Sequence, residues 1–512
     1  MRRTTAVASV VTMLVPLLLA GVGASTASAA ANGSLTVRTL DRSGKPVYAQ
    51  VAVYNTSTND FRFIEGNKKT SLPKGSYELA TSFTGGNGED GIVGGHSVKV
   101  SGATTTTFDA RKGRPVKVSI SPAPGSGYDR TVSAAVCATD NSPATMSTSA
   151  APGDLYVIPN SSKAYELAYG TTYEPRSTTG GDFWLASATH SRGVPSGVSA
   201  TLRKSGLTTL KVYARSGPDS GQARFSFNGE PTGGSGCSSS MDILDIQRDL
   251  PNSFSVHVPA GQWTVGQQAN DFIYGGSHKY AAGKTATLAL GHAVWGPGGQ
   301  LPYTWYHQLY FGDDNPFADP TLTAGGVLAS GTVKLTHAGR TLYSHKYSPS
   351  QELGAQPRIP GSGWYTITET GHRDHLPAGS LSTSSSLSLH FYADAGKNQQ
   401  IRAYITRFSP GALNSRNQAA AGSTTTVGLG MQRNGTGDST IGRLSDSVKS
   451  VRAWYTTDNG STWHAVTTKL SGGRWTTTVH NPAAGRVGLR STVTDTHGDS
   501  STTTVYNAYA VA

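Results

Sequence analysis

Residues 34–55 read SLTVRTLDRSGKPVYAQVAVYN, and the pattern of this stretch recurs along much of the chain. Apolar and polar side chains alternate over 34–41 and again over 47–55. The intervening RSGKP is typical of a turn, because Gly and Pro favour the backbone angles that turns need. Alternation with a period of two indicates strands that bury one face. The stretch therefore predicts two β-strands joined by a turn.

Further alternating segments at 72–83 and 96–120 are separated by turn residues. Short strands at such spacing predict a β-sandwich, and seven strand candidates near the C-terminus match the number in an immunoglobulin-like (Ig-like) sandwich. The middle of the chain is less regular. The expected units are a first β-sandwich at 33–115, a middle β domain at 116–296, a β-sandwich domain at 297–400 and an Ig-like β-sandwich at 401–512.

The composition favours strands over helices. Charged residues make up only 14% of the chain, which has 62 Gly residues and is rich in Ser and Thr. Small hydroxyl residues and Gly suit strands and turns better than helices. We therefore expect an all-β protein built from tandem β-sandwich domains.

The N-terminus has the features of a secretory signal peptide. Arg2 and Arg3 precede an apolar run over 7–20, and the small residues ASA end at Ala29. A membrane anchor fits less well, because the apolar run is short and interrupted by polar residues and Pro. We expect 1–29 to be removed after Ala29, and the mature protein to be secreted without a membrane or wall anchor.

The charge is moderately basic. Removal of Arg2 and Arg3 leaves 41 basic and 31 acidic residues, a net charge of +10. The excess is scattered, and no dense Lys/Arg stripe indicates nucleic-acid binding. Scattered basic residues are explained by a contribution to solubility. The functional alternative is a weak attraction to anionic wall polymers.

Cys137 and Cys237 are the two cysteines of the chain. A lone pair outside the cell usually forms a disulfide. By the chain-entropy relation such a long loop contributes on the order of 4–5 kcal/mol, less any strain. A catalytic thiol is the competing hypothesis, but nothing near either cysteine in the sequence would activate it.

The octet TTDNGSTW at 456–463 matches the hairpins of sialidase-like propellers. Those motifs recur once per blade, and a propeller needs about four or more blades. This chain has one copy, flanked by alternating segments, with DNG where a hairpin needs positive φ. Asp458 can accept backbone N–H groups in the turn, and Trp463 can cover it. We therefore predict a structural hairpin rather than part of a sugar-cleaving site.

Other candidates are weaker. His372, Asp374 and His375 lie together in GHRDH, but strand periodicity places His375 on the opposite face, so we expect a polar surface loop and no metal. The HExxH, EF-hand, Walker, GxGxxG and GxSxG patterns are absent, so no cofactor is expected.

Some carboxylates are isolated along the sequence: Glu166, Glu174, Glu352 and Glu369. Three aromatic residues could stack on sugars, with a place in the core as the alternative: Trp295, Trp305 and Tyr306.

Four stretches carry a resemblance to a known family: SLTVRTLDRSGKPVYAQVAVYN with LPKGSYEL, TTTTFDARKGRPVKVSI (104–120), ITRFSPGALNSRNQAAAGSTTTVGLGMQR (405–433), and VRAWYTTDNGSTWHAV with RVGLRSTVTDTHGDSSTTTVYNAYAV. They resemble the non-catalytic C-terminal extension of large secreted subtilisin-like serine proteases of actinobacteria. The resemblance implies that the sandwich at 33–115 is carboxypeptidase-regulatory-like, and it supports the Ig-like unit at 401–512. HGTH and GTSMAxP-like segments are absent, so protease activity does not transfer.

We therefore expect a secreted, monomeric, non-catalytic protein that binds an extracellular protein or a cell-envelope polysaccharide, with no nucleic acid as partner. Two alternatives stay open at this point. One is a hydrolase whose site is assembled within 116–296, and the other is a structural spacer or accessory partner of a secreted protease. Fold alone does not choose between them.

Overall fold

The computed structural model describes residues 32–512, apart from short internal stretches. These stretches are 86–87, 140–142, 178–179, 217–220, 232–236, 238–240, 242, 270, 300, 312–313, 319–328, 349–353, 378, 434–439 and 443–447. The fold is all-β, as predicted, with two short 3-10 turns, η1 (Ala110–Lys112) and η2 (Lys204–Gly206). The expected signal peptide at 1–29 lies outside the described residues.

The N-terminal part contains two sheets. The smaller sheet has the order β4 (Lys69–Pro73), β1 (Asn32–Leu40), β7 (Ala103–Asp109). The larger has the order β14 (Val198–Arg203), β8 (Arg114–Ser121), β11 (Leu155–Ile158), β6 (Gly91–Val100), β5 (Gly75–Thr84), β2 (Gln50–Asn55), β3 (Phe61–Glu65).

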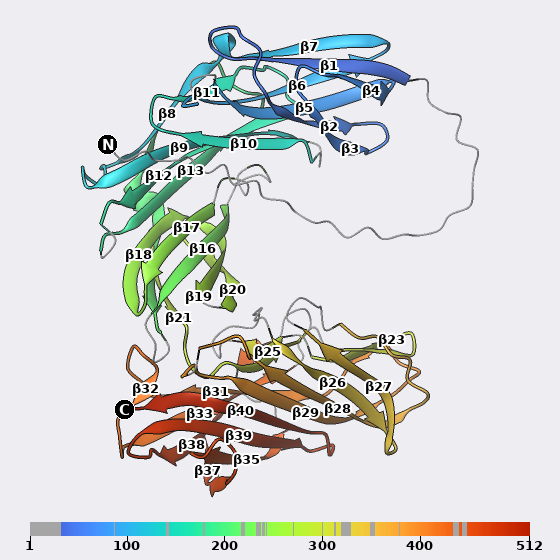
Figure 1. Cartoon of the computed structure of the whole chain (residues 1–512), viewed down its shortest axis with the longest axis vertical. Coiled ribbons are helices and arrows are strands. Elements are labelled where there is room, and N and C mark those ends of the chain that lie inside the picture. Colours follow the sequence, from blue (N-terminus) through green and yellow to red (C-terminus); the bar gives the residue numbers. More distant parts are fainter. Residues whose placement is uncertain are drawn as a thin grey trace.

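A second seven-stranded sheet runs from the N-terminal part into the middle of the molecule (Figure 1). Its order is β10 (Thr145–Ala150), β9 (Tyr128–Ala138), β12 (Tyr165–Pro175), β13 (Phe183–His190), β18 (Asn252–Pro259), β15 (Leu207–Ala214), β21 (Thr285–Leu290). A four-stranded sheet packs on its second half, in the order β17 (Ile243–Asp249), β16 (Gln222–Pro231), β19 (Gly261–Ala269), β20 (Asp271–Tyr280).

The C-terminal part is organised around a nine-stranded sheet. Its main path is β27 (Arg340–Tyr347), β26 (Ser330–His337), β28 (Gly363–His372), β29 (Ser384–Ala393), β40 (Ser500–Val511), β39 (Gly485–Asp495), β35 (Val448–Thr456), β36 (His464–Val466), and β32 (Gln418–Ala419) also pairs with β40. A five-stranded sheet faces it: β31 (Tyr404–Pro410), β33 (Thr424–Arg433), β38 (Arg474–His480), β37 (Thr468–Ser471), with β34 (Thr440–Gly442) beside β33. Small sheets pair β22 (Gly296–Gly299) with β25 (Asp314–Ala318), and β24 (Gln308–Tyr310) with β23 (Tyr303–Trp305) and β30 (Gln399–Gln400).

Sheets cross two of the expected domain limits. β8 spans the limit between 115 and 116, and β11 and β14 from the expected middle domain complete the same sheet. Likewise β29 pairs with β40, so one sheet joins strands from 297–400 and 401–512. Alternation along a strand shows which face is buried but carries no information about which strand lies beside it.

The central strands of the larger N-terminal sheet, β6, β5 and β2, are largely buried on both faces, because one core lies between the sheet and β4-β1-β7 and another between it and the second seven-stranded sheet. Tyr165 of β12 reaches across the second core, and its hydroxyl accepts a hydrogen bond from the backbone N–H of Leu79 (3.1 Å). A Cβ added at Gly95 would lie 2.5 Å from the Tyr165 ring. Gly95 therefore permits the close approach of these two layers.

Asn417 fastens the middle part of the chain to the C-terminal part. It is 0% exposed and has φ 57°. Its side-chain amide donates to the carbonyls of Ser216 (2.9 Å) and Gly291 (2.8 Å), and its side-chain oxygen accepts from Ala293 N–H (3.1 Å). Asn tolerates the left-handed region better than most residues, which suits this position. One side chain thus closes a buried polar junction between distant segments.

Candidate functional site

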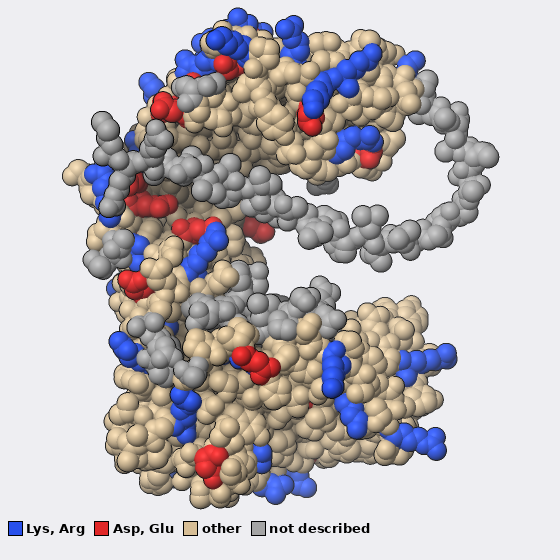
Figure 2. Space-filling model, viewed as in Figure 1, with Lys and Arg blue, Asp and Glu red and all other residues tan. Residues whose placement is uncertain are grey.

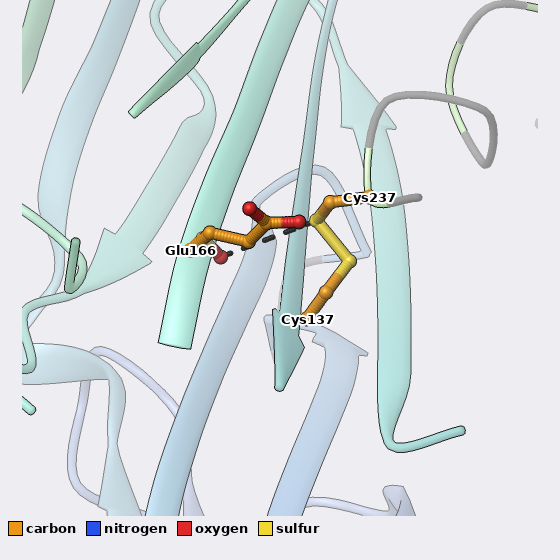
Figure 3. Close-up of side chains that lie close together, drawn as sticks. All are labelled: Cys137, Glu166 and Cys237. Atoms are coloured by element: carbon orange, nitrogen blue, oxygen red, sulfur yellow. Dashed lines mark hydrogen bonds between the residues drawn. A yellow bond between two sulfur atoms is a disulfide. The ribbon is translucent and has the colours of Figure 1, made fainter. Parts of the chain in front are cut away.

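The predicted disulfide between Cys137 and Cys237 is confirmed (Figure 3). Cys137 lies on β9, and both cysteines are buried. The buried side chain of Glu166, on β12, lies beside them, and the three residues offer ligand atoms within 4.8 Å of one another. Both sulfurs are engaged in the disulfide, so they supply neither a thiolate ligand nor a nucleophile. Among the residues that the structure describes, this is the one group of three such ligands.

The octet at 456–463 forms a hairpin turn whose polar groups bond to one another. The Thr456 hydroxyl donates to the Asp458 carboxylate (2.6 Å), which also accepts from Thr462 N–H (2.9 Å). Asn459 and Gly460 have φ 56° and 91°. Since the Asp458 carboxylate is held within the turn, the turn is explained without a substrate.

The hydrogen bond from the Thr456 hydroxyl lowers the pKa of Asp458 from 3.8 to about 2, helped by Thr462 N–H. A lowered pKa stabilises the fold above the unfolded value and is lost as the pH falls through about 2. Between pH 4 and pH 2 we therefore expect the thermal midpoint of the wild type to fall more steeply than that of Asp458→Asn. Calorimetry across this pH window measures both slopes, and equal slopes would contradict this assignment.

The GHRDH segment does not assemble a metal site among the described residues. His372 Nδ1 lies 3.0 Å from the Ser384 hydroxyl, whereas the Asp374 carboxylate accepts from the Ser330 hydroxyl (2.8 Å). The two side chains are thus each engaged by a different strand. Of the isolated carboxylates, Glu352 lies outside the described residues, and Glu369 is buried in β28.

In the middle part, Asp182, His257 and Thr209 form a hydrogen-bonded series that the sequence analysis did not predict. His257 lies with Nε2 3.1 Å from Asp182 Oδ2 and Nδ1 3.0 Å from the Thr209 hydroxyl. A carboxylate, an imidazole and a hydroxyl in this order resemble the arrangement that activates a nucleophile. Burial lowers the pKa of His257, and Asp182 opposes this shift. No local pattern indicates this arrangement, because Asp182, Thr209 and His257 lie on separate segments.

The surroundings of this chain favour a structural role. β15 lies between β18 and β21, so its backbone N–H groups are used by the sheet, and Thr209 N–H donates to the Lys284 carbonyl (2.9 Å). An oxyanion next to the Thr209 hydroxyl would need such donors to be free. One face of the His257 ring stacks on Trp184, with centroids 3.5 Å apart. The Asp182–His257–Thr209 series stabilises the contact between β13 and β18, because these strands share only two residue pairs.

Asp495 and Asp499 form a carboxyl pair that the sequence reasoning also missed. Both are buried, and the pKa of Asp499 is raised by burial and by the charge of Asp495. The Asp495 carboxylate accepts hydrogen bonds from the backbone N–H groups of His497 (2.8 Å) and Asp499 (3.0 Å) within the turn, whereas glycoside hydrolysis needs two carboxyl groups that flank a substrate. Asp499 also accepts from Tyr392 N–H (2.9 Å). The pair therefore shapes the β39–β40 turn.

The three aromatic candidates lie in different surroundings. Trp295 is half-buried, with the Arg373 guanidinium 4.9 Å from its ring centroid. Trp305 and Tyr306 are 47% and 71% exposed and pack edge to face on the β23–β24 hairpin. Tyr306 has φ 46°, a strained angle for a bulky residue.

The outer face of the nine-stranded sheet is a broad and partly exposed surface. The inner face of this sheet packs on both C-terminal cores, while alternate residues point outward. We call this outer surface the hydroxyl face, because Ser and Thr dominate it on five adjacent strands: Thr332, Thr366, Thr368, Thr370, Ser386, Ser388, Thr492, Thr494, Ser500 and Thr502.

Aromatic residues border the hydroxyl face at one end of its strands. Trp364 is 40% exposed and stacks on His390, with ring centroids 5.0 Å apart, while Tyr392 meets it edge to face. At the other end the Arg490 guanidinium lies 3.9 Å from the Trp463 ring centroid. Trp463 of the octet thus packs at the border of this face.

The exposed charge of this sheet is cationic. The acidic residues in its strands are Glu369 and Asp495, which are 3% and 1% exposed. Lys334 and Arg452 are exposed on the outer face. Figure 2 shows more basic than acidic side chains on the visible side of the C-terminal part. In the described part of the chain, no helix has the length and hydropathy to span a bilayer.

Comparison with known proteins identifies no family. No family model matches the chain, and no curated protein matches it. Among solved structures, a leucine-rich repeat protein from Bacteroides thetaiotaomicron is 14% identical over 34% of this chain and 26% of its own, with a TM-score of 0.14. A Salmonella α2-macroglobulin mutant is 9% identical over 93% of this chain and 39% of its own, with a TM-score of 0.16. A streptococcal ancillary pilin is 10% identical over 55% of this chain and 95% of its own, with a TM-score of 0.14. The chain spans well under half the length of the first two structures. These TM-scores are too low to support any conclusion about function.

Proposed function

We propose that this is a secreted, non-catalytic protein that binds an extracellular polysaccharide through the hydroxyl face. The observation that carries the proposal is the broad array of partly exposed Ser and Thr side chains bordered by the Trp364–His390–Tyr392 group. A sugar offers hydroxyl groups that donate and accept hydrogen bonds, and Ser and Thr side chains do the same. The C–H faces of a sugar ring can pack on an exposed aromatic ring. The face offers both kinds of contact on a rigid sheet.

A non-catalytic role is supported by the state of the reactive groups in the described residues. The cysteines are bonded to each other, the Asp458 carboxylate is held in its turn, and Thr209 lies on a fully paired strand. Catalysis needs an activated group with stabilising donors beside the reacting atom. The hydrolase alternative at 116–296 therefore has its best-placed candidate in the Asp182–His257–Thr209 chain, where such donors are already engaged.

Replacement of Trp364 by alanine is expected to weaken polysaccharide binding roughly tenfold or more, because it removes the larger of the two exposed aromatic rings at this border, Trp364 and Tyr392. Affinity electrophoresis of the mature chain in gels containing soluble glycans measures the change. Trp305→Ala is a matched control, since Trp305 lies on a different hairpin. Equal binding by Trp364→Ala and wild type, or a larger loss from Trp305→Ala, would overturn the assignment of the face.

A further inference from the structure

We propose further that the hydroxyl face selects a sparsely charged anionic polysaccharide, which lies across the strands rather than along them. This inference rests on the proposed function and names its ligand class. It comes from one row of residues that the strand registers bring together. The row has a cation at each end and hydroxyl groups between them.

The row is fixed by five successive strand pairings. Lys334 of β26 pairs with Thr368 of β28, and Arg452 of β35 pairs with Thr492 of β39. Between these ends the pairings continue through Ser388 and Thr502. Neighbouring strands lie about 4.8 Å apart, so the two cations stand roughly 24 Å apart across the sheet.

The hydroxyl groups of the row lie side by side with those of the neighbouring rows. The hydroxyl oxygens of Thr492 and Thr502, within the row, are 2.9 Å apart. Those of Thr332 and Thr370, in the adjacent row, are 2.8 Å apart. Each hydroxyl keeps acceptor capacity after one such bond. An extended chain of sugars crossing the strands would therefore meet repeated hydrogen-bonding groups at the strand spacing.

The charge pattern favours an anionic ligand of low charge density. The acidic residues of the sheet strands are buried, so an approaching acid meets Lys334 and Arg452 without a nearby exposed carboxylate in these strands. Nucleic acid fits poorly, because duplex DNA carries a charge about every 1.7 Å and calls for many more cations. Acid groups set apart by uncharged sugars match two cations separated by hydroxyl groups.

The test uses the full mature chain with two probes. The anionic glycan is partly methyl-esterified polygalacturonate, in which uncharged ester sugars separate the acid groups, and the neutral one is a β-glucan of similar length. Lys334→Gln combined with Arg452→Gln is expected to weaken polygalacturonate binding roughly tenfold, because the acid groups of the ligand lose both of the exposed cations with which they pair. The dependence of affinity on salt should flatten in parallel. Binding of the neutral glucan should stay unchanged.

Lys469→Gln combined with Arg474→Gln is the matched control, because it removes one Lys and one Arg from the β37–β38 hairpin of the other sheet. Equal losses in both double variants would show a net-charge effect and overturn the inference. So would preference for polyglutamate over polygalacturonate, which would indicate an acidic protein partner. Trp364-dependent binding without charge selectivity would overturn this inference alone. Binding to neither glycan, together with no retention on peptidoglycan, chitin or cellulose, would overturn the proposed function as well.

Discussion

Replacement of Cys137 and Cys237 by serine is expected to lower the free energy of unfolding by roughly 4–5 kcal/mol. The disulfide closes a loop with a sequence separation of 100, so its loss returns much conformational freedom to the unfolded chain. It also ties β9 to a cysteine that lies between β16 and β17, which belong to a different sheet. Denaturant unfolding of the double variant and the wild type measures the difference.

The effect of a thiol reductant on the free energy of unfolding is the control for this prediction. Wild type unfolded in the presence of a thiol reductant should approach the stability of the double serine variant, and the variant itself should not respond to the reductant. A loss below about 1 kcal/mol in the double variant would contradict the chain-entropy account. Both sulfurs are buried, so slow reduction of the folded protein is expected.

Replacement of Asn417 by alanine is expected to cost about 3 kcal/mol or more, because it leaves several buried polar groups without their partner. The carbonyls of Ser216 and Gly291 and the N–H of Ala293 all lose a hydrogen bond. Each buried group left unsatisfied costs about 1–3 kcal/mol. Alanine also fits the positive φ of this position less well than asparagine. Thermal and denaturant unfolding both report the loss.

Asn414→Ala is the matched control for this junction. Asn414 lies in the same loop and bonds through its side chain to Arg416 N–H and Gln418 N–H, but it is exposed. Its replacement should cost less than about 1 kcal/mol, since water can satisfy the freed groups. Similar losses of stability in the two variants would show that the buried hydrogen bonds of Asn417 do not stabilise the contact between the middle and C-terminal parts.

The sequence predicted the strands and the all-β class well, but not the partners of the strands. Alternation over 34–41 and 47–55 matches β1 and β2, yet β1 pairs with β4 and β7 rather than with β2. Pairing between distant strands depends on the packing of whole faces, which no local pattern records. For the same reason the predicted limit between 400 and 401 separates β29 from β40, although the two strands pair in the structure.

The candidate site was only partly predictable. The disulfide and the hairpin at 456–463 follow from local rules. Trp364 and Tyr365 are neighbours in GWYTITETGHR, and only the phase of the strand separates them: Tyr365 shares the buried face with Ile367. A usable signal was the hydroxyl residue at every second position, Thr366 and Thr368 among them, because alternate positions share a face. Recognising the face required the same pattern on neighbouring strands.

Polysaccharide binding is tested most directly by co-sedimentation of the mature chain with four insoluble polymers across a salt series. The polymers are peptidoglycan, chitin, cellulose and a calcium-polyuronate gel. Released reducing ends are measured in the same tubes. We predict retention on at least one of these polysaccharides at physiological salt, loss of that retention in Trp364→Ala, and no release of reducing ends. Absence of retention on all four, or release of sugar that tracks the protein, would contradict a non-catalytic polysaccharide-binding role.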